Sequence, residues 1–196
     1  MAEGPDGKIY AGGMFTDAGT VAAADYLARW NPISEAWEAV IAGINGAVYA
    51  LAFDANGDLY IGGNFTNLGS NDGDCIVKIT DLNGTPTVNA LGSGITGTNY
   101  TVLSIAIAPN GDVYAGGFFD TAGGVSGAKD IAKWNGTSWS ALSTGLNDSV
   151  YSLAFSPSGN LIIGGIFTDA AYPYLCRWNG SAFSVIGTNT DILGWV

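Results

Sequence analysis

The sequence predicts an all-β protein made of four repeated units. A motif of the form hydrophobic-Tyr/Ile-x-Gly-Gly-x-Phe occurs four times, in residues 8–16, 58–66, 112–120 and 160–168. The first glycines of these motifs, at positions 12, 62, 116 and 164, are 50, 54 and 48 residues apart, a spacing typical of repeat architectures. The chain also contains 30 glycines and six prolines, a composition that suits many short strands joined by tight turns.

The first strand of the unit is predicted at residues 48–53, 102–107 and 150–155. In each copy large and small side chains alternate, which is the period-two pattern of a strand with two differently packed faces. The small positions, 50, 52, 104, 106, 152 and 154, all hold Ala or Ser. We therefore expect this strand to lie innermost, where neighbouring units crowd together.

The Gly-Gly motif is predicted to form the second strand. A turn precedes it at residues 54–57, 108–111 and 156–159, and Asn-Gly in two of these turns is a strong hairpin signal. Glycine inside a strand leaves room for another backbone or a large ring, so we expect the pairs to allow close packing between sheets. The paired glycines are Gly12 and Gly13, Gly62 and Gly63, Gly116 and Gly117, and Gly164 and Gly165.

The third strand is predicted at residues 28–31, 77–80, 132–135 and 176–179, and a short turn leads from it to a fourth strand. One position of the third strand holds four of the six cations of the chain: Arg29, Lys78, Lys133 and Arg177. We expect each cation to pair with an Asp of the neighbouring unit or to stack on a Trp, with a ring of cations around an anion as the alternative. Four antiparallel strands per unit are typical of a β-propeller blade.

The repeat resembles the kelch-like propeller family. Residues 6–13 and 30–37 are similar to its Gly-Gly, aromatic-x-Pro and Trp landmarks, and the Gly-Gly-x-Phe-Thr ending resembles bacterial surface and phage-associated propeller repeats. The resemblance covers the whole chain. It implies one propeller domain, 1–196, of four four-stranded kelch-like blades, with copies at approximately 1–46, 47–99, 100–147 and 148–196.

The two ends of the chain fall within one strand of the repeat. Alignment of the copies places Val196 opposite Ser152 and Met1 opposite Leu51, which is the counterpart of Leu153. We therefore expect the first strand of one blade to be shared between the two ends. Either the ends meet and close a four-bladed ring, or the chain is part of a larger ring or array and self-associates through the cut strand.

Composition and residue content exclude several classes of function. The net charge of −11, with only six cations, argues against nucleic-acid binding. No apolar run is long enough to span a membrane. The chain contains no histidine, which excludes Ser-His-Asp and Cys-His catalysis and the copper site that resemblance to the kelch-like galactose oxidases would imply. We therefore predict no catalytic residues, no enzyme activity and no required cofactor.

Two cysteines lie in non-adjacent copies of the repeat. Cys75 falls in the second copy and Cys176 in the fourth, so they are poorly placed for a disulfide. We expect both to be small buried hydrophobes.

Tyrosines in or near the variable loops are the candidate ligand contacts, because aromatic rings stack on the apolar faces of sugars. These residues are Tyr26, Tyr100, Tyr172 and Tyr174. Calcium is a possible ligand, best placed at Asp72 and Asp74, since it prefers oxygen ligands. The sequence predicts an extracellular, virion-surface or cell-surface structural module that assembles or presents loops for interaction. A carbohydrate-binding propeller is the alternative.

Overall fold

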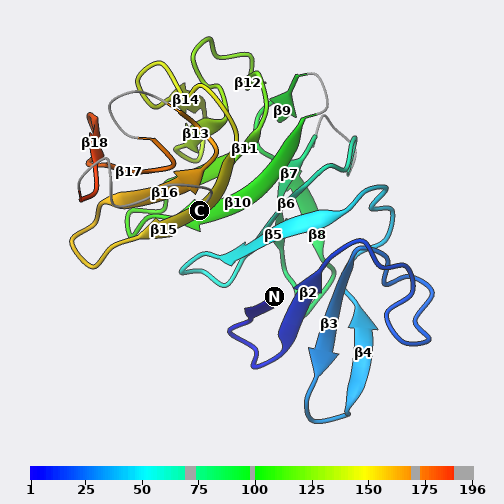
Figure 1. The fold of residues 1–196 in the computed structure, drawn as a ribbon. Helices are drawn as coiled ribbons and strands as arrows, with labels where there is room; N and C mark the ends of the chain where they lie inside the picture. Colours follow the sequence, from blue (N-terminus) through cyan, green and yellow to red (C-terminus); the bar gives the residue numbers. More distant parts are fainter. Residues whose placement is uncertain (69–73, 98–99, 169–172, 188–196) are drawn as a thin grey trace. The chain divides into compact units, whose positions relative to one another are not determined.

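The computed structural model describes residues 1–68, 74–97, 100–168 and 173–187, and its regular structure there consists of β-strands in five small antiparallel sheets (Figure 1). Four of the sheets have four strands and one has two. The chain divides into two compact units, residues 1–94 and 95–196, each with two of the four-stranded sheets. Within the described ranges, no helix is long and apolar enough to cross a membrane. The predicted all-β class is confirmed.

The first unit contains the first and second sheets. The first sheet consists of β1 (Ala2–Glu3), β2 (Ile9–Gly12), β3 (Leu27–Asn31) and β4 (Ala36–Ala39). The second sheet consists of β5 (Val48–Phe53), β6 (Leu59–Gly63), β7 (Ile76–Thr80) and β8 (Thr87–Ala90). Each strand pairs with the next one along the chain, as the hairpin turns predict.

The second unit contains the third and fourth sheets and a small pair of strands. The third sheet consists of β10 (Thr101–Ile107), β11 (Val113–Phe118), β13 (Ile131–Trp134) and β14 (Trp139–Ala141). The fourth consists of β15 (Val150–Phe155), β16 (Leu161–Gly165), β17 (Leu175–Trp178) and β18 (Phe183–Val185). The two-stranded sheet pairs β9 (Ile95–Thr96) with β12 (Thr121–Ala122).

The strand register supports the alignment of the chain's beginning with the middle of the repeat. Ala2 pairs with Tyr10, just as Ala52 pairs with Tyr60 in the second sheet, so β1 takes the place of the end of β5. The proposed closure with residues 194–196 lies outside the described residues. No closed sheet is formed in the described part of the chain, and self-association through this strand stays a prediction.

The two glycines of each motif have different neighbours. A Cβ on Gly12 would lie 2.6 Å from Cγ1 of Val48, and one on Gly116 would lie 2.5 Å from Cγ1 of Val150, so the first glycine lets the next sheet of its unit approach. At Gly63, Gly117 and Gly165 the second glycine instead faces the backbone at the start of the first strand in its own sheet, whereas Gly13 faces the Phe15 ring. At Gly117, for example, a Cβ would overlap the carbonyl oxygen of Thr101.

The first strands of the third and fourth sheets lie together, as expected for innermost strands. The Leu153 N–H of β15 donates to Oγ of Ser104 in β10 at 3.0 Å. In the first unit, the Val48 N–H of β5 donates at 3.2 Å to the carbonyl of Gly13, which follows the second strand of the first sheet. Ala106 is 9% exposed. Small residues at these positions therefore allow contact between sheets.

A residue with left-handed backbone conformation precedes the third strand of every four-stranded sheet. These residues are Tyr26, Cys75, Asp130 and Tyr174, with φ of 62°, 62°, 58° and 65°. Each backbone N–H donates to the carbonyl of the motif phenylalanine, Phe15, Phe65, Phe119 or Phe167. Left-handed φ is uncommon for residues other than glycine, so this shared bond is a defining feature of the repeat.

Both cysteines are fully buried, as predicted. Cys176 belongs to the core of the second unit, together with Ile131, Val150, Ile163 and Phe167. The core of the first unit is built the same way, around Tyr10, Leu27, Leu59, Ile61 and Phe65.

Candidate functional site

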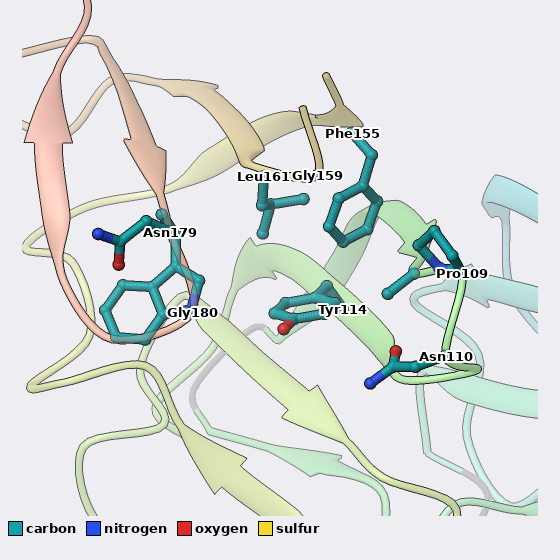
Figure 2. Close-up of a pocket in the computed structure, with 10 residues that line it drawn as sticks. Pro109, Asn110, Tyr114, Phe155, Gly159, Leu161, Asn179 and Gly180 are labelled. Carbon is teal, nitrogen blue, oxygen red and sulfur yellow. The ribbon is translucent and has the colours of Figure 1, made fainter. Parts of the chain in front are cut away.

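A groove in the second unit lies between the third and fourth sheets (Figure 2). Its volume is about 270 Å³. The turn between β10 and β11 contributes Pro109 and Asn110, while the fourth sheet contributes Phe155, Leu161 and the turn after β17. The side chains of Tyr114, Phe155 and Leu161 point toward one another, while the amide of Asn179 points away from them at the edge of this space (Figure 2). Among the described residues, no charged side chain lines it.

Hydrogen bonds within the first turn hold Asn110 at the rim of the groove. Gly111 has φ of +89°, and its N–H donates to the Ala108 carbonyl at 2.9 Å. Asn110 Oδ1 accepts the N–H of Asp112, and Asn110 Nδ2 donates to Oδ2 of the same residue at 3.1 Å. The amide side chain is therefore fixed in place before any ligand arrives.

Aromatic rings form the apolar wall of the groove. Tyr114 and Phe155 meet edge to face, with centroids 5.5 Å apart and planes at 76°. Trp178 packs against Phe183, which is just outside the groove, at 4.7 Å. Burial raises the pKa of Tyr114, partly offset by the nearby charge of Lys133, so its hydroxyl stays protonated at neutral pH. The wall is thus uncharged.

Asn179 supplies a polar group from the fourth sheet. Its Oδ1 accepts the backbone N–H groups of Ser181 and Ala182, each at 2.9 Å, as expected for a residue that closes a tight turn. Its Nδ2 donates to no group within the described part of the chain. The groove therefore combines ring faces with a fixed amide donor.

The three described tyrosines among the predicted ligand contacts do not line this groove. Tyr26 and Tyr174 occupy the left-handed position before the third strand, and Tyr26 packs against the core of the first unit. Tyr100 is partly buried directly before β10. Tyr172 lies outside the described residues. Reasoning from loop position missed the groove because its rings come from regular strands.

The groove residues do carry a signal in the sequence. Pro109 and Asn110 directly precede the glycine of the hairpin turn, Tyr114 is the tyrosine of the repeated motif, and Phe155 ends a first strand. Residues that recur at strand positions are usually core residues, which is why none of these was predicted to bind a ligand.

The predicted calcium site cannot be assembled from the described residues. Asp74 accepts the backbone N–H of Asn67 at 2.8 Å, which ties down its own loop. Asp72 lies outside the described residues. No cluster of three or more Asp, Glu, Cys or His side chains occurs in the described part of the chain.

The row of cations pairs within each sheet and not with an Asp of the neighbouring sheet. Lys78 contacts Asp58 at 2.8 Å and Asp54 at 3.1 Å, and its Nζ lies 5.4 Å from the ring centre of Tyr60, so it faces a tyrosine and not a Trp. Lys133 contacts Asp112 at 3.3 Å.

The two arginines of the row also bond within their own sheets. Arg29 contacts Glu38 at 2.8 Å, and Arg177 donates to Ser184 Oγ at 2.9 Å. Arg29 additionally donates to the Leu82 carbonyl of the second sheet at 2.6 Å. The side-chain partners lie in the same sheet because the third strand is flanked by the second and the fourth. The lysines reach acids at the turn before the second strand, and the arginines reach the residues paired with them on the fourth strand.

Asp130 is a buried carboxylate that the sequence analysis did not single out. Its side chain is 1% exposed, and Oδ1 accepts the Phe119 N–H at 3.1 Å. Oδ2 lies 3.3 Å from Lys129 Nζ but makes no hydrogen bond. Burial raises the pKa of this carboxyl above its usual range.

Solved structures similar to this chain are β-propeller-like proteins. The GH74 enzyme of Niastella koreensis is 20% identical, with a TM-score of 0.57 over 95% of this chain and 29% of that one. PorZ, a bacterial surface component of the type-IX secretion system of Porphyromonas gingivalis, is 12% identical, with a TM-score of 0.54 over 90% and 25%. Virginiamycin B lyase from Staphylococcus aureus is 15% identical, with a TM-score of 0.46 over 70% and 40%.

These comparisons define the class of fold as β-propeller-like, without singling out the kelch type. The chain spans well under half the length of the three proteins named above. No protein-family model matches the sequence. No curated protein matches it either.

The prediction that the chain is not an enzyme is contradicted by these neighbours. They include an enzyme, the GH74 enzyme of Niastella koreensis. The absence of histidine was therefore too narrow a ground for predicting no enzyme activity, since carboxylates alone can act as acid and base. A likeness at this identity shows the fold alone and assigns no reaction to this chain.

Proposed function

We propose that this protein is a carbohydrate-binding β-propeller whose groove between β11 and β16 holds a neutral sugar ring. The observation that carries the proposal is the combination, in one groove, of the Tyr114 and Phe155 rings with the uncommitted Nδ2 donor of Asn179. A sugar ring has an apolar face of C–H groups and an edge of hydroxyls. It therefore needs an apolar wall and fixed polar groups together.

The absence of charge along the groove favours a neutral sugar over an ionic ligand. Asn110 and Asn179 can exchange hydrogen bonds with hydroxyls without the cost of desolvating a charge. The space of about 270 Å³ is at the small end of ligand pockets, which suits one ring of a longer chain.

We further propose that each four-stranded sheet is one blade, so that the chain contributes four blades of kelch-like type. The protein would act outside the cell, or on a cell or virion surface, where glycans are available as ligands. As a repeat module it would present its grooves and loops for interaction, in keeping with its low content of charged residues.

A glycan array with neutral and acidic sugars tests the proposal. We expect saturable binding of neutral glycans by the wild-type protein, and weaker binding by Asn179→Asp. This change keeps the oxygen that closes the turn and removes the amide donor, which should weaken binding at this groove about tenfold.

Asn135→Asp is the matched control. Asn135 closes the equivalent turn of the third sheet, where its Oδ1 accepts the N–H groups of Thr137 and Ser138 at 2.9 Å, but it does not line the groove. It should bind like the wild type. A silent array, or equal binding by Asn179→Asp and wild type, would overturn the proposal.

A further inference from the structure

A second groove, in the first unit, occupies the same place in the repeat as the groove just described. It lies between the first and second sheets and has a volume of about 210 Å³. The turn before β2 contributes Pro5, in the place of Pro109, and the turn before β6 contributes Gly57, in the place of Gly159. The two grooves therefore arise from the same turns of neighbouring sheets.

The aromatic pair behind each groove is also repeated. Tyr10 and Phe53 meet edge to face at 5.1 Å and 75°, against 5.5 Å and 76° for Tyr114 and Phe155. Both pairs join the second strand of one sheet to the first strand of the next. The junction between two sheets therefore forms a groove with the same arrangement of turns and aromatic rings in both units, although the residues at its rim differ.

Neutral amides are available at this second groove too. Asn56 and Asn83 line it, and neither side chain makes a hydrogen bond within the described part of the chain. Asn83 is exposed on the turn between β7 and β8. Asn56 holds the same position of the repeat as Asn110 but on the turn of the other sheet of its pair, and Asn83 comes from the turn after the third strand. Both offer the same donors and acceptors as Asn110 and Asn179.

The carboxylates in this groove already have partners. Asp6 accepts the Tyr10 hydroxyl at 3.1 Å, Asp58 contacts Lys78 at 2.8 Å, and Asp81 accepts the Thr85 N–H at 3.2 Å. They can accept further hydrogen bonds from hydroxyls but would repel an anionic ligand.

From the repetition of turn, aromatic pair and cavity, we infer that the first unit carries a second saccharide-binding groove, and that each chain binds two neutral sugar rings. The inference rests on the proposed function, because it assigns the same ligand class to both grooves. A glycan long enough to occupy two grooves, on one chain or on neighbouring chains, gains avidity over a single ring.

Single and double variants on the same neutral-glycan array test this inference. Asn83→Ala removes an amide without breaking a hydrogen bond of the fold, so it should fold normally and lower the signal. The Asn179→Asp variant should likewise keep part of the wild-type array signal, from the groove in the first unit. The double variant should lose binding to background, and Asn89→Ala, an exposed amide on β8 outside the groove, should bind like the wild type.

The outcomes separate the two proposals. Complete loss of binding with Asn179→Asp alone, or no effect of Asn83→Ala, would overturn the second groove and leave the proposed function standing. Silence of the wild-type protein would overturn both. Equilibrium dialysis with the glycan that binds best should give two sites of similar affinity per wild-type chain, and one unchanged and one weakened site for each single variant. A single site in the wild type would contradict the inference.

Discussion

Asp130 places a carboxylate where the other sheets have Tyr26, Cys75 and Tyr174, and it destabilises the fold at neutral pH. Burial raises the pKa of this carboxyl, so the folded state takes up a proton more readily than the unfolded state. Ionisation therefore lowers stability as pH rises from acid toward neutral values. Lys129 offsets only part of this cost, because it is 43% exposed and partly hydrated.

We expect Asp130→Asn to raise the free energy of unfolding near pH 7 by about 1 kcal/mol. The amide oxygen can still accept the Phe119 N–H, and the unpartnered Oδ2 is replaced by a neutral group. The gain should shrink as the pH is lowered and Asp130 of the wild type becomes protonated. Urea denaturation at several pH values measures both effects. Glu35→Gln, at an exposed turn, is the control, and a gain that does not change with pH would contradict this account.

Glu38 has the opposite pH dependence. Hydrogen bonds from Lys8 first, and then from Asn31 and Arg29, lower its pKa to about 2, although partial burial opposes them. Because the folded pKa lies below the unfolded value of 4.5, its stabilising effect is present above pH 4.5 and is lost as pH falls toward 2. Glu38→Gln should therefore reduce stability near pH 7 by about 1 kcal/mol.

The same denaturation series checks the Glu38 prediction. The difference between Glu38→Gln and wild type should shrink steadily as the pH falls toward 2, because the wild-type carboxylate becomes protonated near that pH. A constant difference across the whole range would mean that the charge of Glu38 has no role, and that shape or packing at this position accounts for the loss.

At the scale of the element, the distance between the two sheets of each unit depends on Gly12 in the first unit and Gly116 in the second. A Cβ on Gly116 would lie 2.5 Å from Val150 Cγ1 and 3.1 Å from Leu153 Cδ1. Gly116→Ala should therefore force β11 and β15 apart and cost about 1–3 kcal/mol. Thermal or urea denaturation measures this cost.

A double-mutant cycle isolates the cause. Val150→Ala removes the clashing methyl groups, so Gly116→Ala should cost less in the Val150→Ala background than in the wild type. Equal costs in both backgrounds would show that strand conformation, and not crowding between sheets, requires glycine at this position.

A second repeated element is the clamp between a loop asparagine and the motif threonine. Asn45 Oδ1 accepts the Thr66 N–H at 2.8 Å, and Asn147 Oδ1 accepts the Thr168 N–H at 2.9 Å. The two asparagines also donate to the hydroxyls of these threonines. The clamp explains why the Gly-Gly-x-Phe motif ends in threonine in these copies, and it was readable from the recurrence of Asn three residues before the first strand.

At the scale of the whole molecule, the net charge of −11 should select against acidic sugars. A uronic-acid oligosaccharide should bind more weakly than its neutral counterpart at low ionic strength. The difference should narrow as salt rises past about 0.1 M, where the Debye length falls to about 10 Å. Titration calorimetry at two salt concentrations measures this, and tighter binding of the acidic sugar at low salt would contradict the assignment of neutral ligands.

The local sequence pattern was sufficient to predict the first strand of the repeat. The predicted first strands at 48–53 and 150–155 coincide with β5 and β15, and the third copy differs by one residue at the start of β10. Alternation of side chains and the hairpin turns specify these segments without help from distant residues. The small sheet of β9 and β12 was not predicted, because two-residue strands carry no periodicity and their pairing joins residues far apart in the chain.

By itself, the sequence determined the all-β class, the four-stranded repeat, the burial of the cysteines and the place of the chain's first residues in the strand. These properties follow from spacing and alternation within one repeat. Only the tertiary structure decided which partners the cations take, that Asp130 Oδ2 is buried without a hydrogen bond, and where the two grooves lie. The reason is that each groove lies at the junction of two sheets. There, aromatic rings that look like core residues within one repeat meet the turns of the neighbouring repeat. No single repeat contains both walls of the groove.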